Sequence, residues 1–248
     1  MTTIYVLWMR QIKRYFRSKT RIIGSLGQPL LFLVALGFGF WPIYQKAGGG
    51  NYIEFLAPGI ICMSILFTSL FAGIEVIRDK QFGFLKETLV APISRLNIMI
   101  GRTLGGSSIA IFQWILVLLI SLAVGFRPEN RWMLIIAFLF MFLVSLLFTA
   151  LGTALASLMD DMHGFQLIMN FLVMPLFFLS WAIFPLTSFP PALRIVSNLN
   201  PLSYGVDGIR AALTWVSYYG VFQDFVILGI ITIVFLVIGT YLFSKIEA

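Results

Sequence analysis

Long apolar runs dominate this sequence and leave it few possible folds. Six stretches have transmembrane length, at residues 22–43, 55–77, 104–125, 133–158, 166–184 and 222–243. A helix needs roughly 20 apolar residues to cross the hydrocarbon core. Backbone groups in lipid must be hydrogen-bonded within the protein, so these runs predict helices, whereas a β-barrel would show short alternating segments. We therefore expect an all-α integral membrane protein, a single domain over residues 1–248 with six transmembrane helices.

Composition supports this class. The chain is 60% hydrophobic and only 11% charged, whereas charged residues make up about 25% of a typical soluble domain. Cys62, the only cysteine, lies inside the second apolar run, so an intrachain disulfide is excluded and a buried small hydrophobic residue is expected.

The basic residues predict the orientation. Twelve of the 17 would lie on one side: six in residues 10–21, five in residues 78–102, and Lys245. The other side would carry Lys46, Arg127, Arg131, Arg194 and Arg210. Because cytoplasmic segments are enriched in Lys and Arg, we expect a multi-pass protein of the cell (inner) membrane with both termini in the cytoplasm. The net charge of +7 then follows from topology and indicates no nucleic-acid partner.

Residues 1–21 are predicted to form an interfacial amphipathic helix. Its basic side chains recur at i, i+3, i+4 and i+7, and Trp8 lies among aromatic residues on the other side; the basic face consists of Arg10, Lys13, Arg14 and Arg17. Such a helix lies at the membrane surface and contacts anionic lipids. Two interpretations stay open: a lipid anchor alone, or a helix that also contacts a partner subunit.

Two connecting segments are unusual. Residues 78–103 are polar, have no role inside a bilayer, and suggest a protein-binding loop. Residues 185–215 are apolar but interrupted by prolines, which predicts two short re-entrant helices at the outer leaflet. We expect Ser188 to cap the first helix and Asn200, followed by Pro201, to cap the second. Asp207 and Arg210, at i and i+3, can pair, which would lower the cost of both charges.

Catalytic and nucleotide-binding motifs are missing from the sequence. There is no GxxxxGK[ST] phosphate loop, HExxH, GxSxG or CxxC. Asp160, Asp161 and His163 lie close together, but a tight turn is expected there and no metal site. Few ionisable residues lie within the spans, which argues against a secondary transporter.

Two segments carry a resemblance to a known family. Residues 83–95, GFLKETLVAPISR, resemble the first cytoplasmic loop of ABC-2 type transporter permeases, and residues 200–210, NPLSYGVDGIR, resemble the segment before their last span. The second segment includes Asn200, Pro201, Tyr204, Asp207 and Arg210. The N-terminal helix and the six-span layout match as well, and the sequence is similar to daunorubicin-resistance and nodulation-factor export permeases.

The resemblance implies the membrane subunit of an ATP-driven exporter of amphiphiles (drugs, lipids or lipid-linked glycans). The chain would be no enzyme and would hold no cofactor by itself, because a separate ATP-binding subunit would bind ATP and Mg²⁺. A second copy, or a homologous permease, would complete the membrane part.

The resemblance also implies that the loop is a coupling helix on the ATPase. Its apolar face would be Phe82, Leu85 and Leu89, with Lys86 and Glu87 at the rim and Phe84 and Arg95 beside them. The alternatives are a non-transporting membrane scaffold or regulator and a secondary transporter. No substrate-binding residue is predicted.

Overall fold

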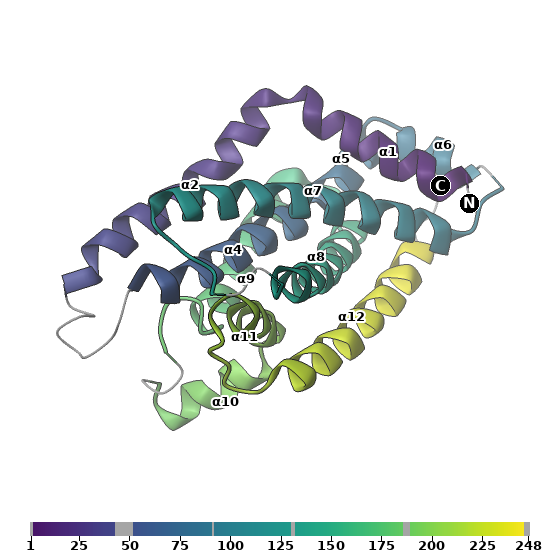
Figure 1. Ribbon diagram of the computed structural model, residues 1–248. Coiled ribbons are helices and arrows are strands. Elements are labelled where there is room, and N and C mark those ends of the chain that lie inside the picture. Colours follow the sequence, from purple (N-terminus) through teal and green to yellow (C-terminus); the bar gives the residue numbers. More distant parts are fainter. Residues whose placement is uncertain (1, 43–51, 91, 130–131, 186–188, 246–248) are drawn as a thin grey trace.

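The computed structural model describes residues 2–42, 52–90, 92–129, 132–185 and 189–245. These residues form helices and no strand, as the apolar runs predict (Figure 1). The helices are α1 Thr2–Arg17, α2 Lys19–Gly39, α4 Tyr52–Phe71, α5 Ile74–Gln81, α6 Phe84–Val90, α7 Arg95–Val124, α8 Leu134–Ser157, α9 Met162–Phe178, α10 Pro191–Leu199, α11 Pro201–Thr214 and α12 Val221–Ser244.

Within the described residues, five helical segments are long and apolar enough to cross a membrane: α2, α4 continued by α5, α7, α8 and α12. The fifth predicted span, residues 166–184, corresponds to α9, which has only 17 residues. At 1.5 Å per residue α9 reaches about 25 Å, less than a hydrocarbon core of about 30 Å. The count of six spans therefore stays a prediction. The predicted end of the first span, at residue 43, lies outside the described residues.

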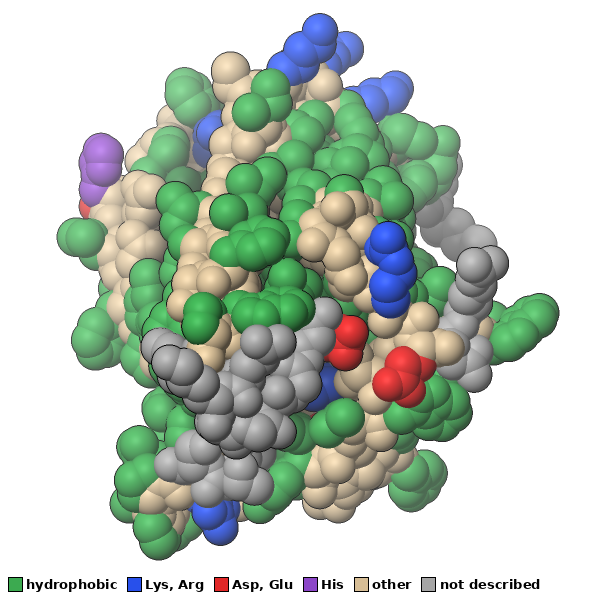
Figure 2. Space-filling model, turned by 60° about the vertical axis from the view of Figure 1, so that its left-hand side comes forward, with side chains coloured by type: hydrophobic (Ala, Val, Ile, Leu, Met, Phe, Trp, Pro, Cys, Tyr) green, Lys and Arg blue, Asp and Glu red, His purple; other side chains and the backbone are tan. Residues whose placement is uncertain are grey.

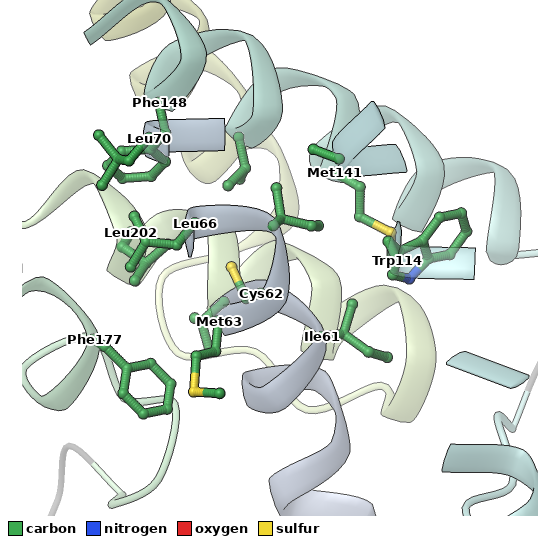
Figure 3. Packing of buried hydrophobic residues seen from close by; sticks show 14 of the residues in the cluster. Ile61, Cys62, Met63, Leu66, Leu70, Trp114, Met141, Phe148, Phe177 and Leu202 are labelled. Atoms are coloured by element: carbon green, nitrogen blue, oxygen red, sulfur yellow. The ribbon is translucent and has the colours of Figure 1, made fainter. Parts of the chain in front are cut away.

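Helix α4 forms the centre of the bundle. Its residues from Leu56 to Leu66 are almost all buried, because α7, α8, α9 and α11 all pack against it. Figure 3 shows Cys62 and Leu66 of α4 among side chains from these neighbours, including Trp114 of α7 and Phe177 of α9. Cys62 is fully buried, as its position in the second apolar run predicts.

Close backbone contacts explain two glycines of this centre. A Cβ at Gly59 would lie 2.2 Å from the carbonyl oxygen of Ala182, and one at Gly152 would lie 2.3 Å from that of Leu70. Only glycine permits such an approach between packed helices. Gly59 thereby holds the turn after α9 against α4, and Gly152 holds α8 against α4.

The proline-interrupted region does form two short helices. Asn200 caps α11, because its side-chain oxygen accepts a hydrogen bond from the Leu202 N–H at 3.0 Å. The α10 N-cap is Pro190, and the predicted cap Ser188 lies outside the described residues. Helix α11 is buried from Leu202 to Leu213, so it lies inside the bundle; re-entry of α10 and α11 from the outer leaflet stays a prediction.

The surface of the bundle matches a membrane environment. Figure 2 shows hydrophobic side chains over much of one face, with several Lys and Arg side chains at its upper edge. Helix α12 exposes large apolar side chains along its length, among them Ile233 and Val237 at 64% exposure each. In water this surface would be unfavourable, whereas it suits contact with lipid or another helix.

Candidate functional site

The chain ends meet the α5–α6 segment at one end of the bundle, which we call the basic end (Figure 1). It comprises α1, α5, α6, the start of α7 and the last turns of α8 and α12. Gly83 separates α5 from α6 and has a φ of +75°, a backbone conformation that favours glycine. The chain therefore turns sharply between Gln81 and Phe84, and the polar loop predicted at residues 78–103 contains a separate short helix.

The two sides of α6 differ in burial. Leu85 is 2% exposed and Thr88 8%, and Leu89 packs against the core cluster. Phe82 and Val90 are each 78% exposed. The exposed side of α6 carries Lys86, Glu87 and Val90, and Phe82 is exposed just before the break at Gly83.

The predicted apolar face of Phe82, Leu85 and Leu89 is therefore wrong. A continuous helix would place them together, but the break at Gly83 turns Phe82 outward while Leu85 and Leu89 hold α6 to the bundle. Whether α6 binds an ATPase stays a prediction, as does a role of Arg95, which begins α7 and is half-buried.

Two arginines of α1 pair with two carboxylates of α5. Arg10 makes a bidentate contact with Asp79, at 2.9 and 2.7 Å, and Arg14 donates to Glu75. The two arginines are spaced i, i+4 on α1, and the two carboxylates are spaced i, i+4 on α5. The first arginine pairs with the second carboxylate and the second arginine with the first. The two helices therefore form an antiparallel ladder of two ion pairs.

Arg10 also connects α1 to α6. Its guanidinium carbon lies 3.6 Å from the centre of the Phe84 ring, a cation–π geometry. One side chain thus contacts α5 through Asp79 and α6 through Phe84.

Three more arginines contact the same carboxylates. Arg102 of α7 donates to Asp79 at 2.7 Å, and both side chains are only 2% exposed. Arg21 of α2 donates to Glu75 at 2.8 Å, and Arg78 lies 3.6 Å from it. Burying a charge is costly unless it is paired; here two carboxylates join α1, α2, α5 and α7.

The α5 helix is held from its other side by the α8–α9 turn. The Lys80 ammonium donates to the carbonyl of Ser157 at 2.8 Å and to Asp160 at 3.0 Å, and the Gln81 amide donates to the carbonyl of Asp160. Asp161 caps α9 by accepting from the backbone N–H groups of Gly164 and His163. These bonds hold the pKa of Asp161 below its usual value, and the tight turn predicted for residues 160–163 is present.

The aromatic side of α1 lies along α7. The Trp8 indole donates to the Ser108 hydroxyl at 2.9 Å, and the Tyr15 hydroxyl donates to Gln113 at the same distance. A Cβ at Gly101 would lie 3.1 Å from Leu7, so α1 and α7 approach closely.

This packing changes the expected role of the basic face. Arg10 and Arg14 bind the protein's own carboxylates, whereas Lys13 and Arg17 are exposed. Only the last two are available to lipid headgroups or a partner, and both interpretations of α1 remain open.

The second resembling segment is held by its own polar contacts. The Asp207 carboxylate accepts from the backbone N–H groups of Tyr218 and Tyr219, at 2.9 and 2.7 Å, and from the Ser217 hydroxyl at 3.1 Å. Asp207 therefore fixes the connection between α11 and α12. Tyr204 donates to the carbonyl of Asn198 at 2.6 Å, which links α11 to α10.

Among the described residues, Asp207 and Arg210 each have other partners, and the pair that their spacing allows is not among the ion pairs. Arg210 donates to the carbonyls of Trp181 and Phe55, at 2.9 and 3.2 Å, and its guanidinium carbon lies 4.4 and 4.2 Å from the centres of their rings. Carbonyl groups and aromatic rings thus hold Arg210, whereas backbone N–H groups after α11 hold Asp207.

Tyr219 is part of the connection between α11 and α12, and its hydroxyl donates to the Asn198 side chain at 2.6 Å. Its ring centre is 4.8 Å from that of Tyr204. Burial, followed by the neighbouring tyrosines and carboxylates, raises the pKa of Tyr219 above its usual value. The phenol therefore stays protonated and keeps donating well into the alkaline range.

Sequence reasoning missed Glu75 and Asp79 as the centre of the site. Their i, i+4 spacing matches that of Arg10 and Arg14, and that match was the available signal. It also missed Asp224, in the first turn of α12, which is fully buried.

Comparisons with known proteins give the family. The model of the ABC-2 type transporter family matches residues 2–214. The chain is 31% identical to a protein of Cyanophora paradoxa named as a transport permease, ycf38, over 98% of this chain and 88% of the relative. It is 25% identical to the inner membrane transport permease YadH of Escherichia coli strain K12, over 94% and 91% of the two chains. It is 24% identical to nodulation protein J of Sinorhizobium fredii, over 84% and 79%.

The family match covers the ladder, the α5–α6 segment and α11, and the relatives named as permeases align along most of their own length. This chain therefore belongs to the ABC-2 type transporter family.

Proposed function

We propose that this protein is the membrane subunit of an ATP-driven exporter of an amphiphile. A separate subunit binds ATP and Mg²⁺, and α6 is the point at which that subunit contacts the membrane domain. The protein lies in the cell (inner) membrane, with both termini and the basic end on the cytoplasmic side.

The arrangement of α6 carries this proposal. The α5–α6 segment exposes two apolar side chains, Phe82 before the break at Gly83 and Val90 at the end of α6, while Leu85 anchors α6 from behind. A segment that only connected two spans would need neither the exposed aromatic ring nor bonds on both sides of α5. The ion pairs with α1 and α7 and the Lys80 bonds to the α8–α9 turn would carry a displacement of α6 into the spans.

A cavity of about 460 Å³ between α2, α4 and α9 is the candidate path for the amphiphile. Its wall combines Phe67 and Phe71 with polar groups from Arg21, Gln28 and Thr68. Such a mixed wall suits a molecule with an apolar body and a polar head.

Exposed polar side chains on α9, which lines this cavity, suggest that a second copy of the chain packs there. Gln166 and Asn170 of α9 are exposed among apolar neighbours. An amide in contact with lipid is unfavourable, so a paired permease or a water-filled path between two copies would cover them. Pairing through α2 and α9 would enclose the cavity between the two chains.

Substitution of Phe82 tests the docking role. In Phe82→Asp the bundle should fold normally, because the side chain is exposed, but the ATP-binding subunit should no longer copurify in mild detergent. Phe82→Leu, which keeps an apolar side chain, is the matched control and should retain it. Leu85→Asp should instead lower the stability of the permease itself. Normal copurification of Phe82→Asp would overturn the docking assignment.

Vanadate-sensitive ATP hydrolysis by the purified complex tests the transport role. An exporter should hydrolyse ATP faster when its amphiphile is added, and reconstituted vesicles should move that amphiphile only with ATP. A complex whose ATPase responds to no amphiphile would favour a scaffold or regulator. Transport driven by an ion gradient without any ATPase would favour a secondary transporter.

A further inference from the structure

A groove lies on the surface of the helix bundle, between the start of α7 and the last turns of α12. Figure 1 shows the end of α12 (yellow) reaching the start of α7. The groove has a volume of about 380 Å³ and is lined by Leu96 and Ile100 from α7 and by Ile233, Leu236, Val237 and Tyr241 from α12. The Thr240 hydroxyl also lines it but donates to the carbonyl of Leu236, so the wall offers little to a polar ligand.

Two basic residues lie next to the groove wall along the chain at the basic end. Arg95 begins α7, one residue before Leu96, and one of its guanidinium nitrogens is enclosed without a hydrogen-bond partner among the described residues. Lys245 follows Tyr241 by one helical turn, and its ammonium lies 4.6 Å from the centre of the Tyr241 ring. Neither cation takes part in an ion pair within the described part of the chain.

Phospholipid with an anionic headgroup fits this combination best. The apolar groove is exposed on two helices that can span a membrane, where acyl chains are the natural occupant. Basic side chains near the membrane surface attract anionic headgroups, and tyrosine is enriched at the same level. A partner helix would instead be expected to meet small residues that allow close approach, whereas this wall consists of large side chains.

We propose that the α7–α12 groove binds one acyl chain of an anionic phospholipid whose phosphate contacts Arg95 and Lys245. The bound lipid braces α12 against α7 at the point where Gly239 of α12 already meets Met99 of α7, since a Cβ at Gly239 would lie 2.5 Å from the Met99 methyl group. This site lies on α7 and α12, away from the cavity between α2, α4 and α9, so it goes beyond the proposed export path.

Native mass spectrometry of the full chain in mild detergent tests the site. Phosphatidylglycerol and phosphatidylcholine with the same acyl chains are titrated separately. Each cation near the membrane surface contributes about 1 kcal/mol, so two of them should favour phosphatidylglycerol by about 30-fold. Arg95→Gln/Lys245→Gln should abolish this preference, because it weakens phosphatidylglycerol binding far more than binding of phosphatidylcholine, whose choline group offsets the phosphate charge.

Two controls separate this site from general attraction. Lys13→Gln/Arg17→Gln removes two exposed charges from α1 at the same end and should keep the preference. Val237→Trp fills the groove and should weaken binding of both lipids, and elution of the folded chain in gel filtration shows that it is intact. The inference is overturned if the preference survives Arg95→Gln/Lys245→Gln, if the α1 variant loses it equally, or if glycerol phosphate, which has no acyl chain, displaces the lipid.

Discussion

Removal of the Asp79 charge should destabilise this protein far more than removal of the Arg10 charge, although the two side chains bind each other. Asp79 and Arg102 are each only 2% exposed, whereas Arg10 is 29% exposed. In Asp79→Asn, Arg102 is left as a buried charge without its carboxylate, and breaking a buried pair in this way costs about 3–5 kcal/mol. In Arg10→Gln, Asp79 keeps Arg102, and the lost pair is screened by water, so the cost should be about 1 kcal/mol or less.

Equilibrium unfolding in mixed micelles with a rising fraction of SDS measures this difference. The double variant Asp79→Asn/Arg102→Met removes the stranded charge together with its partner and leaves Arg10 free to reach water. It should recover at least about 2 kcal/mol of the stability lost in Asp79→Asn, since an apolar replacement of a buried pair is often close to neutral.

Equal losses in Asp79→Asn and Arg10→Gln would refute this reasoning, because burial would then not decide which pair matters. Failure of the double variant to recover stability would refute it as well. That result would mean that Asp79 acts through the geometry of α5 and not by neutralising Arg102.

Three further predictions concern the rest of the bundle. Gly59→Ala should destabilise the fold by at least about 2 kcal/mol in the same assay, because its Cβ would lie 2.2 Å from the Ala182 carbonyl; Gly24→Ala, with nothing within 4 Å, is the control and should be neutral or stabilising by up to about 1 kcal/mol. Asn200→Ala should cost about 1–2 kcal/mol through loss of the α11 cap, and an unchanged unfolding midpoint would contradict the cap's role. Tyr219 has a pKa raised above the ordinary 10.0, so its contribution to stability is present below that pH and lost as the pH rises above it; Tyr219→Phe should show a weaker alkaline fall in thermal stability, and identical pH profiles would contradict this.

The helices of this protein can be predicted from its sequence, because an apolar run in lipid must satisfy its backbone hydrogen bonds within the protein and a helix does so. The predicted run at 133–158 differs from α8, Leu134–Ser157, by one residue at each end. The cap of α11 could also be predicted, since it depends only on Asn200 and Pro201 as neighbours in sequence. Such local rules need no knowledge of the partners of a helix.

Side-chain partners from distant helices could not be predicted in the same way. The break at Gly83 needs one residue with positive φ, and periodicity carried through it assigns Phe82 to the wrong side. Asp207 and Arg210 are near in sequence, but each finds its partners elsewhere, the first in the turn after α11 and the second in the carbonyls of Trp181 and Phe55. Spacing along one helix shows which pairs can form, whereas burial and competing donors decide which do.

Unequal burial also decides which contacts can change when α6 is displaced. A conformational change is driven only by the difference in ligand affinity between two states, commonly a few kcal/mol. The partly exposed pairs of Arg10 and Arg14 with α5 can exchange for water at about 1 kcal/mol or less each, whereas separating Asp79 from Arg102 would use the whole of that energy. We therefore expect α5 to stay with α7 in any displacement of α6, and α1, which packs along α7 through Trp8 and Tyr15, to follow them.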